Sequence, residues 1–393
     1  MRRILSLALL FAGALRAETA LVLSFFNHAK SANLDWVGES IAQSVRDSPA
    51  SEGILVLDRE DRLEAYRRLS LRPGAELTHA SILKIGESLD ASQVVYGFYE
   101  LLPAEPGKEQ SQGSLRITAR ILDLKHTRQG AIYSELGALE DLGLLAVHLG
   151  WQTLQWLNPK AAPDEREFMK ARPAVRLDAV ESYVRGLLST SPEQRHRYFT
   201  QAARLDAHYS QPCFQLGKTF WENKDYKVAA GWLERVARAD PHYLEAQFFL
   251  GLCRFANGDF KGAEQSFRLV AAAVPLNEVY NDLGVVQAQL QDYVAAAASF
   301  RKALEGDDAD PDYHFNLGAA LWRAGQYTPA ADSFRAALAR NSADNEATTL
   351  LGRTLKKEAA RPVDTRPDGK PRLKTNYDEA AFRQLQAELG IKR

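Results

Sequence analysis

The chain has 393 residues, of which 46% are hydrophobic and 25% are charged, and its formal net charge is -1. This composition is typical of a soluble globular protein of two or three domains. A charge so close to neutral gives no support for nucleic-acid binding, so we expect no nucleic-acid partner.

Residues 1–20 predict a secretory signal peptide. Arg2 and Arg3 precede an apolar run, and small residues follow it, so cleavage is expected after Ala14 or Ala17. The alternative is an uncleaved membrane anchor, but about a dozen apolar residues fall short of the roughly 20 that span a bilayer. No other stretch is long and apolar enough. We therefore expect a periplasmic or secreted protein with no transmembrane segment in the mature chain.

Residues 21–157 predict a small α/β domain. The expected strands cover residues 20–26, 54–58, 93–101, 115–124 and 131–137, and the expected helices cover residues 34–48, 59–71, 78–89 and 139–157. In the fourth strand, Leu115, Ile117 and Ile121 alternate with polar residues, which indicates one buried and one solvated face. The order βαβααβββα predicts two layers around a mixed sheet.

This domain resembles the amino-terminal domain of TolB-type periplasmic proteins. The motifs that carry the resemblance are Phe25-Phe26-Asn27, Trp36-Val37-Gly38-Glu39-Ser40-Ile41, Ile85-Gly86, Val94-Val95-Tyr96-Gly97 and residues 116–123. The TolB β-propeller has no counterpart here, because nothing downstream has the periodicity of short strands that a propeller needs. The resemblance implies an envelope-associated interaction domain and no reaction. Residues 158–175, with prolines at 159, 163 and 173, are predicted to be a linker.

Residues 176–360 contain an internal repeat. The pair Leu-Gly recurs every 33 or 34 residues, and an aromatic residue, an alanine and a large apolar residue follow it at matching offsets. The five pairs are Leu216-Gly217, Leu250-Gly251, Leu283-Gly284, Leu317-Gly318 and Leu351-Gly352. Each unit predicts two helices that approach closely at the glycine and the alanine. One such pair leaves an apolar face uncovered, so neighbouring units must stack into a curved solenoid.

This pattern resembles the tetratricopeptide repeat (TPR) family. The resemblance implies about four full repeats with degenerate ends, namely a first unit around Tyr183 and Gly186 and a lone helix at residues 344–360. The expected fold class is α+β: a small α/β mixed-sheet N-terminal domain followed by an all-α TPR solenoid. Cys213 and Cys253 are six positions out of step on adjacent first helices, roughly 9 Å apart along the axis. We expect two buried thiols and no disulfide.

Residues 361–393 predict a basic extension and a short C-terminal helix. Residues 377–389 place Ala381, Phe382, Leu385 and Leu389 on one face of that helix. The favoured interpretation is a cap on the final repeat, and the alternative is a detachable segment that binds a partner.

Few residues indicate chemistry. The sequence lacks a glycine-rich phosphate loop, His-Glu-x-x-His, Gly-x-Ser-x-Gly and Cys-x-x-Cys. None of the eight histidines has a second ligand at a helical spacing suited to zinc. His28, after the first strand, is expected to be a surface residue. Asp35 and Glu39 fit the charge pattern of a helix amino terminus. We therefore expect neither catalysis, nor a metal, nor a cofactor.

The binding surface is expected in the concave groove, which the first helix of each unit lines in TPR proteins. Counting from each Leu-Gly pair gives a protein-binding groove of Phe214, Lys218, Trp221, Phe248, Leu252, Phe255, Asn281, Val285, Ala288, Phe315, Ala319 and Trp322. Aromatic residues of this kind anchor partner proteins. The basic clamp with which the family holds a terminal carboxylate is not reproduced, so that ligand is not expected.

These observations predict a non-catalytic exported scaffold that binds a protein or peptide partner through the TPR groove and the N-terminal domain. The alternative is an envelope receptor for a small ligand or cell-wall fragment in the α/β domain, which a sizeable pocket there would favour. The third alternative is an enzyme with an unrecognised site, which would need a cluster of buried titratable residues. For the groove itself, the alternative is that its aromatic residues are covered by the C-terminal helix or by the N-terminal domain.

Overall fold

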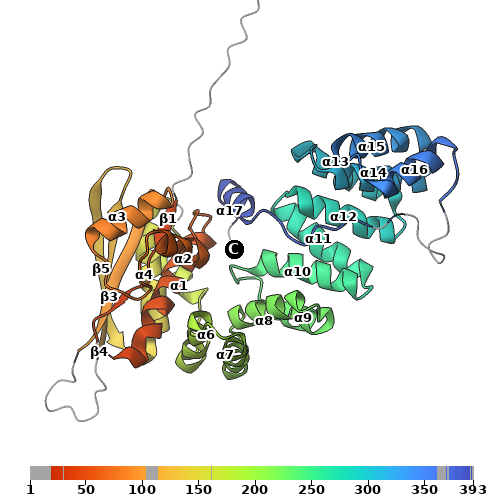
Figure 1. Cartoon of the computed structure of the whole chain (residues 1–393). Coiled ribbons are helices and arrows are strands. Elements are labelled where there is room, and N and C mark those ends of the chain that lie inside the picture. The colour runs from red at the N-terminus through yellow and green to blue at the C-terminus, as the bar shows by residue number, and fades with distance from the viewer. Residues whose placement is uncertain are drawn as a thin grey trace, which may run out of the picture.

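The computed structural model describes residues 19–29, 31–102, 114–160, 162–360, 369, 371–389 and 391. Nearly all of the predicted signal peptide lies outside these described residues. The chain forms a small domain with one sheet, followed by a long run of paired helices (Figure 1). The predicted fold class is therefore confirmed.

The sheet is mixed, as predicted. Its strands β1 (Ala20–Val22), β3 (Gln93–Leu102), β4 (Ser114–Asp123) and β5 (Arg128–Ala138) lie in the order β1-β3-β4-β5. The short strand β2 (Phe26–Asn27) also pairs with β3. Both β1 and β2 run parallel to β3, whereas β3, β4 and β5 are antiparallel neighbours.

Two predicted strands differ from the structure. The first run is interrupted between β1 and β2, because the backbone N–H of Phe25 donates to the carbonyl of Gly38 (3.2 Å) instead of joining the sheet. A methyl group at Gly38 would lie 2.0 Å from the carbonyl oxygen of Phe25, and one at Gly97 would lie 2.6 Å from its ring. The strand predicted at residues 54–58 is reduced to one isolated bridge between Ala20 and Val56.

Helices pack on both faces of the sheet, but they leave one face open along β5. The helices α1 (Asp35–Ser51) and α4 (Leu142–Leu157) pack on the face that carries Val95, Ile117 and Ile121. The helices α2 (Arg59–Arg68) and α3 (His79–Ser88) cover the other face at Leu21 and Val94. Short 3-10 turns, η1 (Ala32–Leu34) and η2 (Leu139–Asp141), precede α1 and α4.

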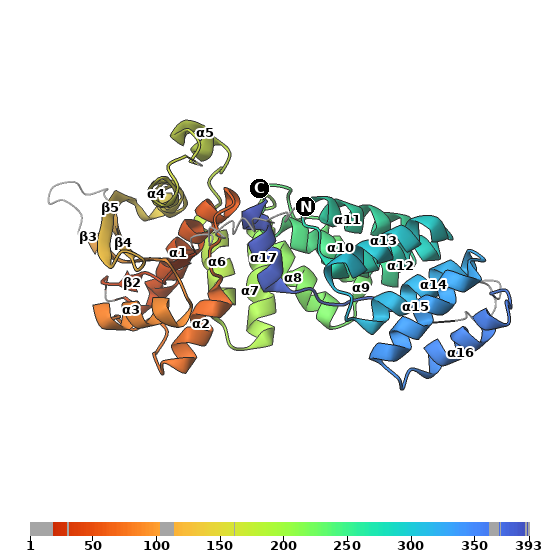
Figure 2. The same cartoon turned by 90° about the horizontal axis from the view of Figure 1, so that it is seen from above.

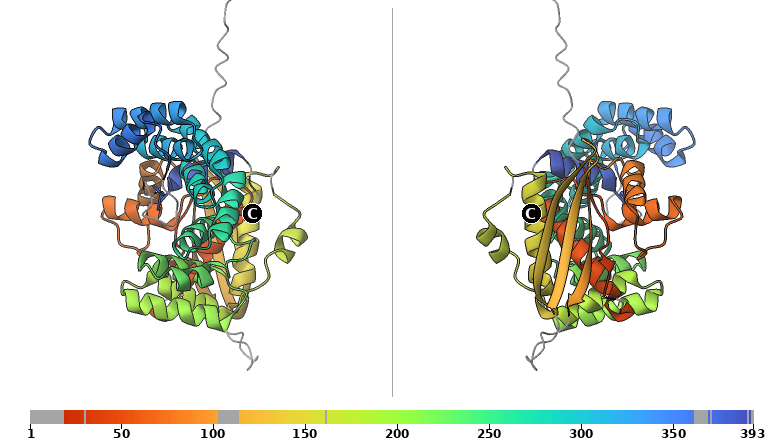
Figure 3. Two further views of the ribbon diagram at one scale, coloured as in Figure 1. Left: turned by 90° about the vertical axis from the view of Figure 1, so that its right-hand side faces the viewer. Right: turned by 90° about the vertical axis from the view of Figure 1, so that its left-hand side faces the viewer.

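The outer face of the sheet is open along β5. Its apolar side chains Ile132 and Leu136 are 62% and 59% exposed. In the right-hand view of Figure 3 the strands face the viewer with no helix in front of them. The face of the sheet along β5 is therefore left uncovered by the described helices.

The segment predicted as a linker contains the short helix α5 (Glu165–Lys170). Phe168 is almost fully buried, and the guanidinium of Arg172 lies 3.6 Å from the centre of its ring. Arg172 also reaches the end of α1, where it donates to the hydroxyl of Ser51. This segment therefore packs against the sheet domain.

The repeat region consists of antiparallel helix pairs. They are α6 (Leu177–Leu188) with α7 (Pro192–Leu205), α8 (Gln211–Glu222) with α9 (Tyr226–Leu233), α10 (Tyr243–Ala256) with α11 (Phe260–Ala273), α12 (Asn277–Gln289) with α13 (Tyr293–Gly306), and α14 (Pro311–Arg323) with α15 (Tyr327–Arg340). Helix α16 (Asn345–Leu355) follows alone.

The repeat glycines lie against the large apolar residue of the second helix, as the pattern predicts. A methyl group at Gly251, Gly284 or Gly318 would lie within 2.9 Å of a ring carbon of the phenylalanine in its own unit. In the degenerate first unit, Gly186 stands in the same relation to Phe199. Close packing of this kind is what makes the two helices of each unit one structural element.

The C-terminal helix α17 (Glu379–Glu388) does not cap the final repeat, so that prediction was wrong. It lies at the opposite end of the solenoid, between the sheet domain and α10 (Figures 1 and 2). Arg383 forms ion pairs with Asp58 and Asp61 at the start of α2. Phe382 on its apolar face is 3% exposed, whereas Leu389, predicted on the same face, is 53% exposed.

Candidate functional site

The C-terminal residues 371–378 run through the solenoid as an irregular, extended segment that leads into α17. They contact α14 and α16 first, then α12, then α10, so they travel from the last repeat toward the sheet domain. Residues 372–374 are half-buried and residues 375–376 are exposed. We call residues 371–389 the C-terminal segment and the surface that it contacts on α10, α12, α14 and α16 the groove.

Two asparagines hold the backbone of this segment. The side-chain amides of Asn281 on α12 and Asn316 on α14 both donate to the carbonyl oxygen of Arg372, at 2.8 and 2.9 Å. Asn316 also donates to the amide oxygen of Asn281 (2.8 Å) and accepts from the N–H of Arg372 (3.3 Å). Because these bonds reach main-chain atoms, this clamp holds the backbone of the segment independently of its side chains.

A carboxylate pocket with an aromatic floor binds the side chain of Arg372. Its guanidinium lies 3.4 Å above the centre of the Phe315 ring, which is a close cation–π contact. Its Nη1 lies 2.7 Å from Asp344 and 3.1 Å from Asp312, and its Nη2 lies 3.6 Å from Glu346. Burial would raise the pKa of Asp344, but its bonds to Arg372 and the backbone outweigh this and the pKa lies below its ordinary value.

Lys374 points into the same group of carboxylates. Its Nζ lies 2.7 Å from Asp310 and 2.8 Å from Asp312, at the start of α14. Its backbone N–H donates to Asp282 Oδ1 on α12 (2.8 Å). Asp282 is fully buried, and burial raises its pKa well above the ordinary value.

Aromatic contacts follow where the segment reaches α10. The ring of Tyr377 lies 4.9 Å from that of Phe248 and 5.1 Å from that of Phe382, and its hydroxyl donates to Glu245 Oε1 (2.9 Å). One residue later, Asp378 caps α17 through the N–H groups of residues 380 and 381. The segment is therefore held by its backbone, by two cations and by an aromatic cluster.

The predicted groove residues fall into two groups. Phe248, Asn281 and Phe315 contact the C-terminal segment directly. The other nine predicted residues contact side chains within the repeats themselves. They are Phe214, Lys218, Trp221, Leu252, Phe255, Val285, Ala288, Ala319 and Trp322.

Several of these predicted residues have partners inside the solenoid. Trp322 is 1% exposed, and its indole N–H donates to the carbonyl of Glu358 (2.8 Å). Phe214 stacks on the ring of His242 at 4.6 Å. Lys218 lies 5.7 Å above the ring of Phe214. These side chains stabilise the repeats, so they are poor probes of partner binding.

The sequence interpretation included Asn281 but missed the other polar residues that hold the segment, among them Asp282 and Asn316. Asn281 and Asp282 stand two positions and one position before Leu283, and Asn316 stands directly before Leu317. The second full repeat has Phe248 and Phe249 at the corresponding places. This change from apolar to polar residues at a fixed position of the repeat could have indicated the contact. Asp310 and Asp344 gave no such indication, because in the sequence they resemble ordinary helix caps.

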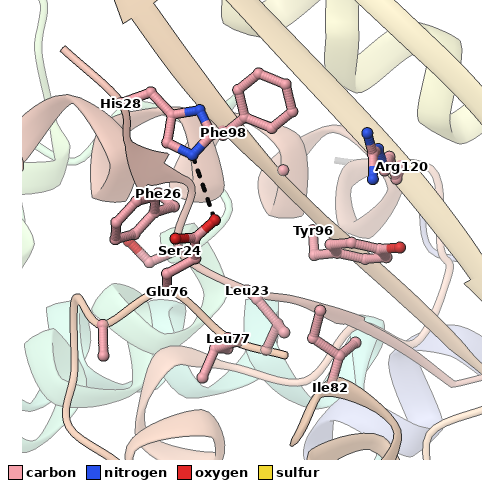
Figure 4. A pocket seen from close by; sticks show the side chains of 12 residues that line it. Leu23, Ser24, Phe26, His28, Glu76, Leu77, Ile82, Tyr96, Phe98 and Arg120 are labelled. Carbon is pink, nitrogen blue, oxygen red and sulfur yellow. Dashed lines mark hydrogen bonds and ion pairs between the residues drawn. The ribbon is translucent and has the colours of Figure 1, made fainter. Parts of the chain in front are cut away.

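A cavity of about 120 Å³ lies in the sheet domain, between β2, β3 and the loop before α3 (Figure 4). His28 lies at its edge, with Nε2 3.5 Å from Glu76 and its ring 4.6 Å from that of Phe98. Arg120 and Tyr96 line the far side. The cavity combines apolar walls with a few polar groups, but it is smaller than the roughly 300 Å³ at which typical ligand sites begin.

Glu39 does not act as a helix-terminus charge, so that interpretation was wrong. Its carboxylate is buried. Arg62 Nη2 donates to both carboxylate oxygens, at 2.5 and 2.7 Å, and Arg59 Nε donates to one of them (3.1 Å). Burial would raise the pKa of Glu39, but the two guanidiniums outweigh it and the pKa is lowered. The pair ties α1 to α2 inside the sheet domain.

The described residues contain no group of three or more histidine, cysteine, aspartate or glutamate side chains arranged to hold a metal ion. Both cysteines in the solenoid are free and buried, as predicted. Within the same described ranges, no helix combines the length and the apolar character that a membrane crossing requires.

Known proteins resemble the solenoid. The family model for the tetratricopeptide repeat matches residues 214–278, 281–346 and 315–355, so these parts of the chain are tetratricopeptide repeats. A comparison with curated proteins found no match.

Solved structures with a similar arrangement include other repeat proteins. YrrB, described as a TPR protein with an unusual peptide-binding site, is 19% identical and has a TM-score of 0.37, over 40% of this chain and 82% of its own. MamA (residues 41 to the end) from Desulfovibrio magneticus RS-1 is 23% identical with a TM-score of 0.38, over 44% of this chain and 99% of its own.

Proposed function

We propose that this protein is a non-catalytic scaffold, exported from the cytoplasm, that binds an extended segment of a partner protein in the groove of its TPR solenoid. The observation that carries the proposal is the clamp of Asn281 and Asn316 on the carbonyl of Arg372. Two side chains from successive repeats converge on one main-chain atom of a segment that has no secondary structure of its own. That geometry suits any extended peptide with the same backbone path.

Export rests on the amino-terminal sequence, where two arginines, an apolar run and small residues follow one another as in a signal peptide. A mature chain that begins after Ala14 or Ala17, found by amino-terminal sequencing of the native protein, would support export. A native protein that retains Arg2 and Arg3 would contradict cleavage.

Cross-linking in the native compartment tests the scaffold proposal. The parent should capture a partner whose cross-linked peptide maps to α12 or α14, and the variant Asn281→Ala, Asn316→Ala should lose it. A matched control, Asn223→Ala with Asn257→Ala, changes two exposed asparagines in the turns between helices. If the clamp variant and the control capture the same set as the parent, the groove is not the binding surface.

The clamp variant leaves the aromatic residues of the predicted groove unchanged. Truncating a buried residue such as Trp322 or Phe248 costs roughly 3 to 5 kcal/mol of stability, and a lost partner would then report unfolding. Asn281 and Asn316 lie in the contact with the segment itself, so their loss is more specific.

A receptor for a small ligand in the sheet domain is the second candidate. The cavity beside His28 and Arg120 favours it, because apolar walls and converging polar groups are the features of a ligand site. Its volume of about 120 Å³ limits the ligand to a few heavy atoms, which suits a cell-wall fragment poorly. The groove therefore remains the better-supported surface.

A further inference from the structure

The C-terminal segment of the chain itself lies in the groove, and its contacts indicate which chemical features a partner needs in order to bind there. This inference rests on the proposed function, because it names the partner chemistry and the control of the same groove. The relevant contacts span 91 residues of sequence between Asn281 and Arg372, so they are made on folding and not by local chain preference.

The groove is acidic where the segment crosses α12, α14 and α16. Arg372 and Lys374 together face Asp310, Asp312, Asp344 and Glu346. The side chain of Asp344 is only 6% exposed. When the segment leaves, these carboxylates lose their counter-charges at close range, so an occupant that restores two cations is favoured over a neutral or acidic one.

The spacing of the cations follows from the path of the backbone. Arg372 and Lys374 are separated by one residue, and in an extended chain alternate side chains point the same way. Both therefore reach Asp312, while Leu373 between them packs against the apolar core of the repeats. Three residues after Lys374, Tyr377 enters the aromatic cluster on α10. From residue 372 to residue 377 the pattern is therefore a basic, an apolar and a basic residue, then two exposed positions, then an aromatic residue.

The same segment also connects the two parts of the chain. Beyond Tyr377, helix α17 brings Arg383 to Asp58 and Asp61 at the cap of α2, and Phe382 is buried beside Tyr377. Removing the segment from the groove therefore also removes a contact that joins the solenoid to the sheet domain. Occupancy of the groove and the connection between the domains are thereby coupled.

We propose that residues 371–389 are an internal ligand that closes the groove, and that the partner is a protein whose extended basic segment carries the same pattern and displaces them. Binding is then a competition between two basic segments for one set of carboxylates. The internal segment has the advantage of being tethered, so the parent chain binds an outside peptide weakly.

The test uses the full-length chain and a labelled synthetic peptide of residues 369–391. The variant Arg372→Glu, Lys374→Glu of the protein reverses both cations and opens the groove. It should bind the peptide at least about 30-fold more tightly than the parent does. A control protein, Lys261→Glu with Arg335→Glu, makes the same change of charge on exposed second helices and should bind as weakly as the parent.

A second peptide, with Glu in place of Arg372 and Lys374, tests the chemistry. The opened variant should bind it at least about 30-fold less tightly than the native peptide. Hydrogen exchange checks that the variant is folded and open: amides of α17 should exchange faster than in the parent, while those of α12 and α14 keep their protection. If α17 exchanges at the parent rate, the two cations do not hold the segment and the inference fails.

The remaining outcomes separate this inference from the proposed function. Equal affinity of the opened variant for both peptides would refute the preference for basic segments but leave the groove as a peptide site. Equal affinity of the parent and the opened variant for the native peptide would refute the internal ligand. If the opened variant binds neither peptide, both the inference and the proposed function fall.

Discussion

Adding one methyl group at Gly284 is expected to destabilise the solenoid, whereas adding one at Gly352 is expected to stabilise it. Both glycines occupy the same position of the repeat, in the interior of a first helix. A methyl at Gly284 would lie 2.7 to 2.9 Å from three ring carbons of Phe300. At Gly352 nothing lies within 4 Å, and among the described residues no second helix of that unit packs there.

The expected magnitudes follow from two opposing effects. Replacing glycine by alanine inside a helix gains about 0.5 to 1 kcal/mol from the lower entropy of the unfolded chain. Overpacking a well-filled site costs about 1 to 3 kcal/mol. Phe300 is 1% exposed, so its ring is enclosed by other side chains. Gly284→Ala should therefore lose up to about 2 kcal/mol, and Gly352→Ala should gain up to about 1 kcal/mol.

Urea denaturation followed by circular dichroism measures the difference. The order of the midpoints is the useful quantity, because stacked repeats need not unfold in one step. Gly318→Ala, whose methyl would meet Phe334 at 2.9 Å, should behave like Gly284→Ala. If Gly284→Ala were as stable as Gly352→Ala, the close contact between glycine and phenylalanine within each repeat would be refuted.

Three further perturbations have defined outcomes. Glu39→Gln should destabilise the sheet domain by about 3 to 5 kcal/mol at neutral pH, because it leaves Arg62 buried without its counter-charge. The folded pKa of Glu39 is lowered, so its contribution is present above the unfolded pKa and is lost as pH falls through the folded pKa. The stabilities of parent and variant should therefore converge in acid, and equal stabilities at neutral pH would contradict a role for the pair. Ala296→Phe should cost about 1 to 3 kcal/mol in a thermal melt, because Ala296 is 0% exposed between packed helices, and an unchanged melting temperature would contradict the packing. Cys213 and Cys253 should both resist a thiol reagent until the chain is unfolded, because burial raises their pKa, that of Cys253 to about 12, and rapid labelling of the native protein would refute this.

The repeats were readable from the sequence because their decisive contacts are short-range. Gly251 meets Phe267, and Gly284 meets Phe300, within one unit of two helices. Each such contact recurs at the repeat period, so the sequence repeats wherever the structure does. The mixed sheet was predictable for a similar reason, since the alternation along β4 reflects one buried face.

The sequence offered the C-terminal helix as one cover for the groove, but it did not indicate the extended residues that lie there, because an extended segment has no periodicity. Residues 371–378 use side chains from two successive repeats to satisfy their backbone, and nothing in their own sequence specifies those partners. The position of α17 was mispredicted for the same reason. Its apolar face fits any apolar surface, and the ion pairs of Arg383 with α2 bridge more than 300 residues of sequence.

Glu39 is a second case in which sequence position misleads. A carboxylate in the first turns of a helix usually faces solvent and complements the helix dipole. Here, however, α2 crosses α1 and brings Arg62 to within 2.5 Å of it. Only the packing of two helices, which no local pattern specifies, turns an ordinary acidic residue into a buried ion pair.

Cutting the covalent tether of the C-terminal segment tests the central claim most directly. A protease site engineered within residues 361–368 of the full-length chain allows the C-terminal fragment to be separated from the folded protein after cleavage. Size-exclusion chromatography then shows whether the fragment travels with the protein. We predict that it co-elutes at micromolar concentration and is released by an excess of the synthetic peptide of residues 369–391. A fragment that separates on its own immediately after cleavage would contradict a groove that binds extended segments.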